Sequence, residues 1–445
     1  MASPEVDGGI SIENGAQPSE TNKKVTTIPN PESNEPTEPE QPETREEDAT
    51  ADNGNLARPE MEDGGDLQST ISTSNGDFDD VTLSPSNGAT KSYAAVASGK
   101  DEKDTRYDED WSYPKLPIIA ESQQLLFHCM SIILLVSIFW LICANPLTWP
   151  ILVPYLIHLT LSTAASNGRL SYRSEWFRSL RLWKLFTGYF PMKLHKTFDL
   201  PADRKYIFGY HPHGIISHGA WGAFATNALG FRELFPGITN TLLTLDSNFR
   251  LPFNRDWILW MGLQSVSKES IWNMLTKGGP NNDGQGRAVT IVVGGARESL
   301  EAQPGTLRLI LKGRKGFVKM ALRTGADLVP VIGFGENDLY DQLSPKTHPI
   351  VHQMQMIFLK VFKFTVPALH GRGVLNYDVG LMPYRRPVNI VIGRPLRVER
   401  PHGPQPAQED IDELHERYIR EVEKLWEAYK DQFSPDRKAE MEIFA

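Results

Sequence analysis

The chain has very few cysteines, and this shortage excludes several kinds of site. Only Cys129 and Cys143 occur among its 445 residues, and both lie in a strongly apolar stretch. Two cysteines cannot build a disulfide framework or a cysteine-based metal site. The sequence after Cys143 has no thiol, which agrees with a reducing compartment and leaves no cysteine to act as a nucleophile there.

Several common motifs are missing as well. The chain does not open with a basic segment followed by an apolar core, so a secretory signal peptide is not predicted. A Gly-Gly turn at 294–295 allows for a nucleotide-binding loop, but neither G-x-x-x-x-G-K-[ST] nor G-x-G-x-x-G follows it. No G-x-S-x-G elbow is found, so no serine nucleophile of the hydrolase type is predicted.

Positive charge is scarce in the first quarter of the chain. Residues 1–110 carry 26 acidic and 8 basic side chains, whereas residues 111–445 carry 29 and 38. Residues 1–113 are also poor in large apolar side chains, so they bury too little surface to offset the entropy of ordering, and we predict a disordered acidic tail. The basic remainder suits a partner with phosphates, whether a membrane surface, a nucleotide-like cofactor or nucleic acid.

A long uncharged stretch follows the tail. Residues 125–144 are long enough to cross a hydrocarbon core of about 30 Å as one helix. A second apolar run over 147–165 contains Pro150 and Pro154, which predict a kinked or re-entrant arm. We therefore expect a membrane hairpin within 114–168, and basic residues after it favour cytosolic termini. A buried hairpin of a soluble domain is the alternative, which the length of the charge-free run disfavours.

The remaining sequence alternates between short apolar runs and segments with helical spacing. This alternation predicts an α/β domain over 169–435 with a buried sheet flanked by helices, followed by a flexible C-terminus at 436–445. Strands are expected at 205–210, 239–245, 288–293, 307–311, 328–332 and 388–392, and helices at about 217–229, 254–262, 268–276, 314–324 and 407–432.

A histidine cluster directly follows the first predicted strand. His211, His213 and His218 lie within eight positions, and imidazole suits proton transfer near neutral pH. Pro212 stiffens the run, and Gly214 lets the backbone approach a ligand closely. Two other interpretations stay open: His211 and His213 could bind a metal, although no further ligands lie nearby, or they could be structural residues of a strand–helix turn.

Two further segments combine glycines and cations. Gly294, Gly295, Arg297 and Glu298 follow a predicted strand, where a tight turn can direct backbone amides outward. Residues 314–319 open a predicted helix, and cations at a helix N-terminus attract phosphate, although an ordinary solvated basic face explains them equally well. The cations of this second segment are Arg314, Lys315 and Lys319.

Taken together, these segments resemble the type-2 diacylglycerol acyltransferase family, which includes monoacylglycerol and wax-ester acyltransferases. The similarity runs from about residue 120 to 430. Each matching block alone is only modestly specific for the family, whereas the whole set in this order is highly specific. The matching blocks are YFP at 189–191, HPHG at 211–214, FPG at 235–237, GGARE at 294–298, RKGFVKMALRTGADLVPV at 314–331, FGEN at 334–337, Arg372-Gly373 with Asn376-Tyr377, and 383–395.

The resemblance implies a glycerolipid-acyltransferase-like fold and transfer of an acyl group from acyl-CoA to the free hydroxyl of diacylglycerol. It also implies an endoplasmic reticulum membrane location that extends to lipid droplets, with the termini and the active site in the cytosol. Monoacylglycerol, a long-chain alcohol or a sterol are alternative acceptors, and a non-catalytic lipid-droplet scaffold is an alternative from another class. We expect no metal, no cofactor besides the co-substrate acyl-CoA, and no nucleic-acid partner; a homo-oligomer is left open.

Related glycerolipid acyltransferases use a His-x4-Asp pair, and this chain departs from that pattern. The fifth position after His213 is His218, and the fifth after His211 is Ile216. We therefore expect His211 or His213 to be the general base and Glu298 to supply the missing carboxylate. Backbone amides near Gly214 or 294–295 are the expected oxyanion donors, and Arg297, Arg314, Lys315 and Lys319 are expected to bind the phosphates of CoA.

Overall fold

The computed structural model describes residues 131–343, 345, 347–362, 367–373, 380–399 and 405–444, so the predicted acidic tail and the first part of the predicted hairpin lie outside the described residues. The helical elements are α3 Ser131–Cys143, η2 Pro146–Thr148, α4 Trp149–Leu161, α5 Glu175–Arg178, α6 Arg181–Tyr189, α7 His218–Ala220, η3 Trp221–Ala225, α8 Phe231–Leu234, η4 Asp246–Arg250, α9 Asn254–Trp260, α10 Lys268–Thr276, α11 Gly295–Ser299, α12 Gly316–Thr324, η5 Glu336–Leu339, α13 Pro349–Phe362 and α14 Gln408–Phe433.

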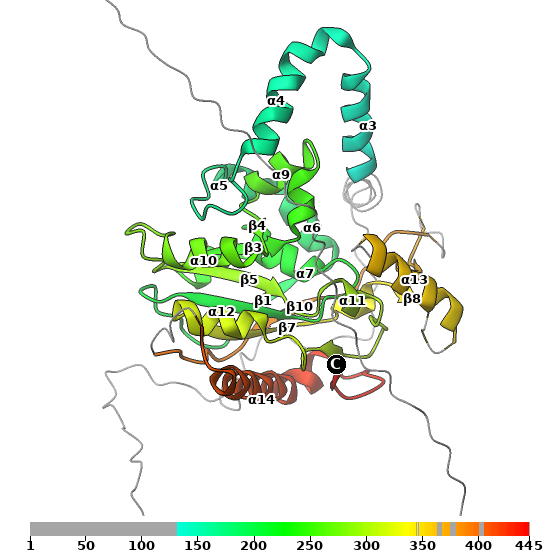
Figure 1. Cartoon of the computed structure of the whole chain (residues 1–445). Coiled ribbons are helices and arrows are strands. Elements are labelled where there is room, and N and C mark those ends of the chain that lie inside the picture. The colour runs from blue at the N-terminus through cyan, green and yellow to red at the C-terminus, as the bar shows by residue number, and fades with distance from the viewer. Residues whose placement is uncertain are drawn as a thin grey trace, which may run out of the picture. The chain divides into compact units, whose positions relative to one another are not determined.

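A mixed sheet forms the centre of the domain (Figure 1). Within the described residues it has seven strands in the order β1-β10-β7-β2-β5-β3-β4, and the five strands from β7 to β4 run parallel to one another. β10 pairs antiparallel with β7, and β1 pairs parallel with β10, so these two strands run opposite to the other five. The strands are β1 Lys193–Lys196, β2 Tyr206–His211, β3 Thr239–Thr244, β4 Gln264–Ser265, β5 Arg287–Val292, β6 Arg308–Ile310, β7 Asp327–Phe334, β8 Asp341–Gln342, β9 Leu369–His370, β10 Asn389–Ile392 and β11 Glu442–Phe444.

Alternation along the central strands divides the buried side chains between two cores. In β2, Ile207 joins one core, whereas Phe208 and Tyr210 join the other, as expected for successive residues of a strand. The first core is covered by α10, α12 and α14, and the second contains side chains from α6, α7, η3 and α9. Because both faces are covered, the predicted α/β domain with a sheet flanked by helices is confirmed.

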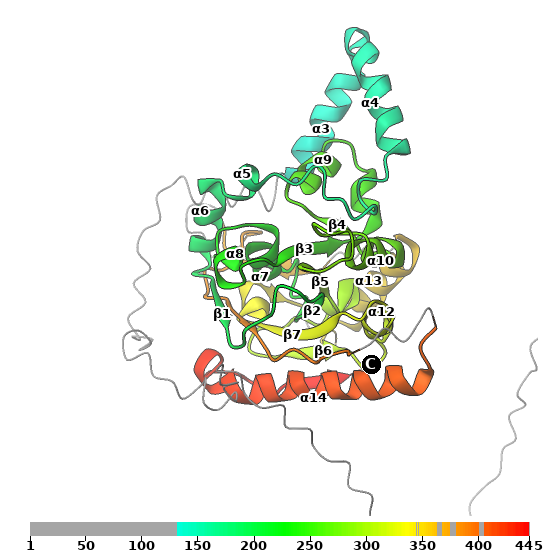
Figure 2. The same ribbon diagram turned by 90° about the vertical axis from the view of Figure 1, so that its left-hand side faces the viewer.

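The apolar stretch before the domain forms a bent pair of helices rather than one span. No single helix among the described residues is long and apolar enough to cross a membrane, but segments 134–143 and 146–161 meet that test together, with an angle of 94° between them. Asn145 accepts a hydrogen bond from the Leu147 amide in the connection, and Pro146 opens the next turn. The pair projects from the domain on the side opposite α14 (Figures 1 and 2).

The second arm is attached to the domain through α9. The Tyr155 hydroxyl donates to Asp256 Oδ2 over 2.6 Å and accepts from the Phe253 amide over 2.8 Å. The Phe253 ring also stacks on Tyr155 and meets Phe139 of α3 edge-on. Most other large side chains of the pair, such as Leu147, are exposed, so the helices have an apolar surface that the described residues do not cover.

Two segments differ from the sequence-based expectation. The helix expected at 217–229 ends at Ala225 with a π-helical turn, because the Thr226 hydroxyl bonds to Gly222 O and the chain becomes extended. Residues 442–444, placed in a flexible C-terminus, form β11 and pair in parallel with β6. A segment of three residues is too short to show the pattern of a strand in the sequence. It is extended because it forms backbone hydrogen bonds with β6.

Candidate active site

Three of the predicted motifs meet at the carboxyl edge of the parallel strands. HPHG continues from the end of β2, GGARE follows β5, and FGEN follows β7, and these three strands are direct neighbours. The loops leaving such strand ends are where ligands bind in open α/β sheets. The structure therefore brings together residues that are more than 80 positions apart in the chain.

Glu298 attaches the GGARE segment to the histidine loop. One of its carboxylate oxygens accepts from the His213 backbone amide over 2.6 Å, and the other accepts from the Ile310 amide over 2.7 Å. Burial raises the pKa of the Glu298 carboxyl to about 7, although both amides favour its charged form. The sequence predicts that Glu298 orients an imidazole, but its carboxylate binds the backbone amide of His213 and not the ring.

Glu336 of FGEN holds the same loop from the other side, and motif analysis did not assign it a role. Its carboxylate is 1% exposed and accepts from the His218 amide, the Gly219 amide and the Tyr210 hydroxyl at 2.6, 2.8 and 2.8 Å. A side chain at Gly214, which has φ +56°, would collide with Glu336. The glycine of HPHG is thus required by close packing against this carboxylate.

The two histidines of HPHG have different surroundings. His211 is fully buried, and its Nε2 lies 3.0 Å from the hydroxyl of Tyr418 on α14. That hydroxyl donates to Gly209 O over 3.1 Å, so it accepts a hydrogen bond from the protonated Nε2 of the neutral His211 ring. Burial lowers the pKa of His211 to about 3. Tyr418 gave no sequence signal, because it lies 207 positions from His211 in a helix with ordinary amphipathic spacing.

His213 is only partly buried. Its Nδ1 lies 3.2 Å from Gly214 O, and a proton on Nδ1 satisfies that carbonyl and leaves the lone pair on Nε2. Burial lowers the pKa of His213, while the negative charge of Glu336 acts in the opposite direction. His213 is consequently neutral near pH 7 and has one ring nitrogen able to accept a proton.

The predicted phosphate-binding cations do not form one group. Arg314 donates to Gly294 O over 3.1 Å and so reaches the GGARE turn. Lys315 instead pairs with Asp412 of α14 over 2.7 Å, before α12 begins at Gly316. Arg297 and Lys319 are exposed.

The glycine turn that the sequence predicts as an oxyanion site also lies at this edge of the sheet. Gly294 packs against the Glu298 side chain, and Gly295 begins α11 with a φ of +66°.

His211 Nε2 is engaged by Tyr418, and no group of three or more His, Cys, Asp or Glu side chains in the described part of the chain could hold a metal ion.

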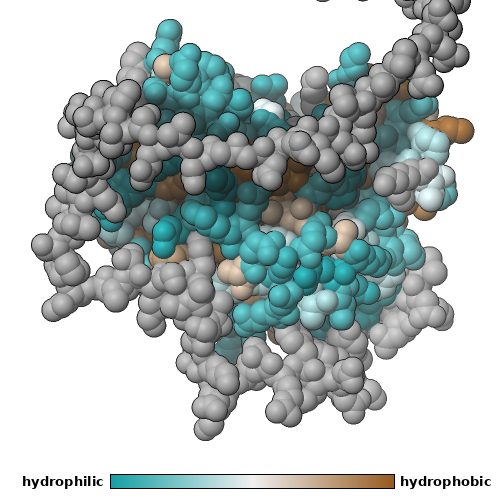
Figure 3. Space-filling model, turned by 90° about the horizontal axis from the view of Figure 1, so that it is seen from below, coloured by the Kyte–Doolittle hydropathy of each residue, from teal (hydrophilic) through white to brown (hydrophobic). Residues whose placement is uncertain are grey.

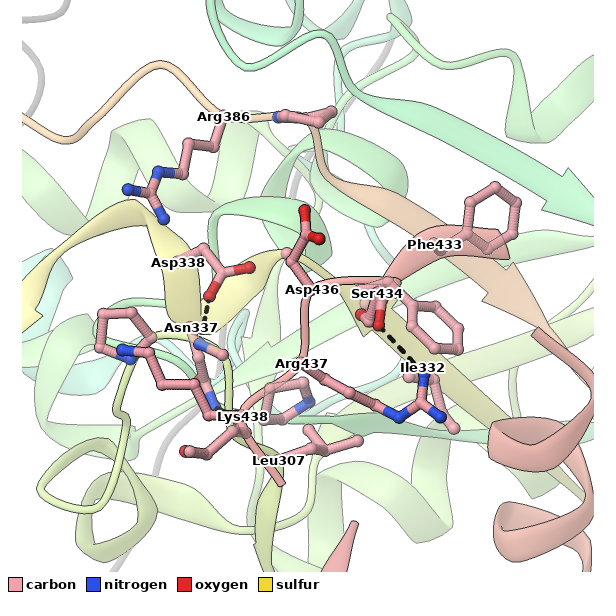
Figure 4. A pocket seen from close by; sticks show the side chains of 18 of the residues that line it. Leu307, Ile332, Asn337, Asp338, Arg386, Phe433, Ser434, Asp436, Arg437 and Lys438 are labelled. Atoms are coloured by element: carbon pink, nitrogen blue, oxygen red, sulfur yellow. Dashed lines mark hydrogen bonds between the residues drawn. The ribbon is translucent and has the colours of Figure 1, made fainter. Parts of the chain in front are cut away.

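A cavity of about 720 Å³ lies beside the histidine loop (Figure 4). Pro212, which separates His211 from His213 in the sequence, forms part of its wall. Its other walls come from the FGEN loop, residues 304–307, Arg386-Pro387 and the C-terminal segment 433–438.

Comparison with known proteins gives a consistent assignment. A family model described as diacylglycerol acyltransferase matches residues 141–443. Diacylglycerol O-acyltransferase 2A of Umbelopsis ramanniana is 46% identical over 333 residues, which cover 74% of this chain and 92% of that protein. Diacylglycerol O-acyltransferase 1 of Schizosaccharomyces pombe is 43% identical over 318 residues, covering 72% and 90%. The 2-acylglycerol O-acyltransferase 1 of Bos taurus is 41% identical over 307 residues, covering 68% and 87%.

Among solved structures, the 1-acyl-sn-glycerophosphate acyltransferase PlsC of Thermotoga maritima aligns with 14% identity and a TM-score of 0.31, over 56% of this chain and 78% of that one. A superposition at that score adds nothing to the strand order given above. The family match begins near the end of α3 and spans α4, the central sheet and all three motifs at its carboxyl edge. This chain belongs to the diacylglycerol acyltransferase family and is an acyltransferase.

Proposed function

We propose that the protein transfers a fatty acyl group from acyl-CoA to the free hydroxyl of diacylglycerol, with His213 as general base. One observation carries the proposal: Glu298 and Glu336 hold the HPHG loop on two sides, and the loop buries His211 while leaving His213 partly exposed. A base must contact the proton that it removes, so the accessible imidazole with a free Nε2 is the better candidate.

The reaction proceeds in two steps without an acyl-enzyme. The acceptor oxygen attacks the thioester carbonyl as its proton passes to His213 Nε2, and a tetrahedral intermediate forms. Its collapse breaks the carbon–sulfur bond, and the thiolate leaves with ready protonation from the imidazolium. The nearby Ser217 hydroxyl donates to the His213 carbonyl rather than to an imidazole nitrogen, so it is not activated as a nucleophile.

Backbone amides supply the remaining assistance. We assign stabilisation of the oxyanion to amides near Gly214 or the 294–295 turn, which lie on the two loops joined by Glu298. A positioned donor of this kind contributes roughly 10²–10³-fold to the rate. In this account His211 is a positioning residue, because its Nε2 is taken by Tyr418 and its low pKa makes it a weak base.

A second acceptor is supported by the relatives. Proteins named 2-acylglycerol O-acyltransferase 1 from Bos taurus and Homo sapiens are 41% and 43% identical to this chain. Acylation of a monoacylglycerol uses the same attack on the thioester and needs no change in the histidine loop.

With either acceptor, we propose that the protein is located in the endoplasmic reticulum membrane and on lipid droplets, because the acceptors are lipids and the exposed helix pair is apolar. The active site and the termini then face the cytosol.

The test uses membranes containing the full chain, labelled oleoyl-CoA and a panel of acceptors. We expect triacylglycerol from diacylglycerol, and a loss of at least ~10²-fold in kcat for His213→Ala. His211→Ala should lower the thermal stability and only partly reduce kcat.

The pH dependence gives a separate prediction. Burial lowers the pKa of His213, and the neutral imidazole is the base. Activity should therefore persist on acidification below pH 6.5 and fall only as the pH passes that lowered pKa.

Two outcomes would contradict this account. If folded His213→Ala kept normal acyl-CoA-dependent synthesis, His213 would not be the base. If the wild type transferred no acyl group to any acceptor, the chain would be a scaffold that retains the fold.

A further inference from the structure

We propose that the cavity beside Pro212 holds the phosphate-bearing thioester donor, acyl-CoA, with Arg386 and Lys438 binding its phosphates at the rim (Figure 4). This inference rests on the proposed function and names the site of its donor. It replaces the assignment of phosphate binding to Arg297, Arg314, Lys315 and Lys319 that the sequence suggested.

The position of the cavity fits a thioester. Pro212, the chain neighbour of the proposed base His213, forms part of its wall. Gly333 and Gly335 at the end of β7 line it too, and a side chain at Gly335 would collide with the backbone at Pro387. A volume of about 720 Å³ is in the range of small-molecule sites, which run from about 300 to 1,000 Å³.

The walls suit the pantetheine arm, a chain of amides and a hydroxyl separated by methylene groups. Leu307, Ile332 and Phe334 supply apolar surface, and Asn337 and Asp338 supply polar groups. An elongated ligand of alternating polarity matches such a mixed lining better than an all-hydrocarbon chain does, because a buried polar group without a partner is costly.

Two cations at the rim form no ion pair among the described residues, although the Arg386 guanidinium lies over the Tyr384 ring, 5.5 Å from its centroid. Arg386 and Lys438 are exposed, and in the described part of the chain neither forms an ion pair with a carboxylate. Arg437, by contrast, is engaged by Asp431 and Glu440. Figure 4 shows Arg386 on one side of the cavity and Arg437 and Lys438 on the other, with carboxylates between them.

The intervening carboxylates differ in their engagement. Asp338 Oδ1 accepts from the Gly305 amide over 2.7 Å, whereas Asp436 is exposed and its side chain makes no hydrogen bond or ion pair among the described residues. The negative charge of Asp436 opposes an anionic ligand. Removal of this charge is therefore expected to strengthen phosphate binding. A variant without it should bind the donor more tightly than the wild type does.

The cavity is built on ordered backbone. Lys438 N donates to Gly305 O over 2.7 Å, and the side-chain amide of Asn337 donates to Thr306 O over 2.9 Å. The C-terminal segment that walls it lies on the α14 side, away from the helix pair (Figures 1 and 2). Side chains visible on that face are mainly hydrophilic (Figure 3). A water-soluble donor thus reaches HPHG from one side while a lipid acceptor comes from the other.

The experiment compares oleoyl-CoA with S-oleoyl-pantetheine, which has the same thioester without phosphates. Arg386→Ala/Lys438→Ala should raise KM for oleoyl-CoA at least ~10-fold, leave its kcat within about two-fold, and leave KM for oleoyl-pantetheine unchanged. Asp436→Asn should lower KM for oleoyl-CoA alone. The matched control is Lys268→Ala/Lys277→Ala, which removes two exposed cations from the ends of α10.

A parallel variant, Arg297→Ala/Arg314→Ala/Lys319→Ala, tests the rival cations. The inference is overturned if the phosphate-dependent rise in KM occurs in this variant instead, if Arg386→Ala/Lys438→Ala behaves like the α10 control, or if KM rises equally for both donors. A wild type inactive with every acyl-CoA would refute the proposed function itself, whereas an active wild type with an unaltered double variant refutes only the site.

Discussion

At the scale of single residues, the active site depends on buried carboxylates that bind backbone. Glu336 accepts three donors, from Tyr210, His218 and Gly219, and Glu298 accepts two. Neither carboxylate has an arginine or lysine partner within 4 Å among the described residues. His218 Nδ1 lies 3.5 Å from Glu336 Oε1. Since neither carboxylate pairs with an arginine or a lysine, hydrogen bonds from the backbone and from Tyr210 are the main stabilisation of the loop that carries the histidines.

Glu336 should therefore be more important than its position outside HPHG suggests. Glu336→Ala leaves two backbone amides and the Tyr210 hydroxyl buried without an acceptor, at about 1–3 kcal/mol each. We expect a lower melting temperature and a fall in kcat with little change in KM for the donor. Glu336→Gln, which keeps one oxygen, should lose less.

The matched control for this prediction is Glu421→Gln. Glu421 is also a mostly buried glutamate, but its ion pair is with Lys424 on the same helix, and its side chain forms no hydrogen bond with the histidine loop among the described residues. Wild-type melting temperature and kcat in both Glu336 variants would show that the carboxylate does not position HPHG.

The same residues show what sequence alone could predict. The sequence predicts HPHG as a candidate site because its histidines directly follow an apolar strand, and short apolar runs predict six of the strands. The roles of Glu336 and Tyr418 could not be found in that way, since they bind Tyr210 and His211 across 126 and 207 positions. Motif spacing likewise suggested one phosphate site from Arg314 to Lys319, whereas Asp412 of the distant α14 engages Lys315.

At the scale of elements, α9 connects the apolar helix pair to the catalytic sheet. Tyr155 of α4 binds both Asp256 and the Phe253 amide, and the Phe253 ring contacts both helices of the pair. The helix α9 belongs to the core on the same side of the sheet as Phe208 and Tyr210. One packed core therefore joins the helix pair, through α9, to the strand that ends at His211.

Weakening this connection should affect lipid acceptors selectively. Tyr155→Phe removes the hydroxyl that serves Asp256 and Phe253, so we expect a several-fold lower kcat with diacylglycerol in vesicles. Activity with a short-chain alcohol in detergent should be unchanged, and sedimentation of the protein with membranes should be normal. Asp256→Asn, which retains an acceptor for Tyr155, is the conservative control. An equal loss with both acceptors would mean that Tyr155 merely stabilises the fold.

At the scale of the whole molecule, the regions proposed to receive the two substrates lie on opposite sides of the sheet. The apolar helix pair projects on one side of the sheet, and α14 and the C-terminal cavity wall lie on the other (Figures 1 and 2). HPHG stands between them at the sheet edge. This arrangement suits a reaction that joins a thioester from the aqueous phase to an alcohol dissolved in lipid. The thioester can reach the histidine loop from water, and the alcohol can reach it from the membrane.

The same arrangement predicts a re-entrant helix pair. At 1.5 Å per residue the 13 residues of α4 extend about 20 Å, less than the ~30 Å of a hydrocarbon core, and the 94° bend redirects the chain. Both flanks should then face the cytosol, with Cys143 near the bend inside the membrane. In a Cys129→Ser background, an impermeant maleimide should not label Cys143 from either side.

Reporter cysteines on the two flanks complete the test. Ser112→Cys and Lys277→Cys, each in a Cys129→Ser/Cys143→Ser background, should both be labelled from the cytosolic side of sealed microsomes and not from the lumen. Labelling of the two positions from opposite sides would establish a straight crossing and exclude the hairpin. Labelling of Cys143 from the cytosol, with both reporters also cytosolic, would place the helix pair on the membrane surface, since a thiol buried in hydrocarbon is inaccessible to a charged reagent.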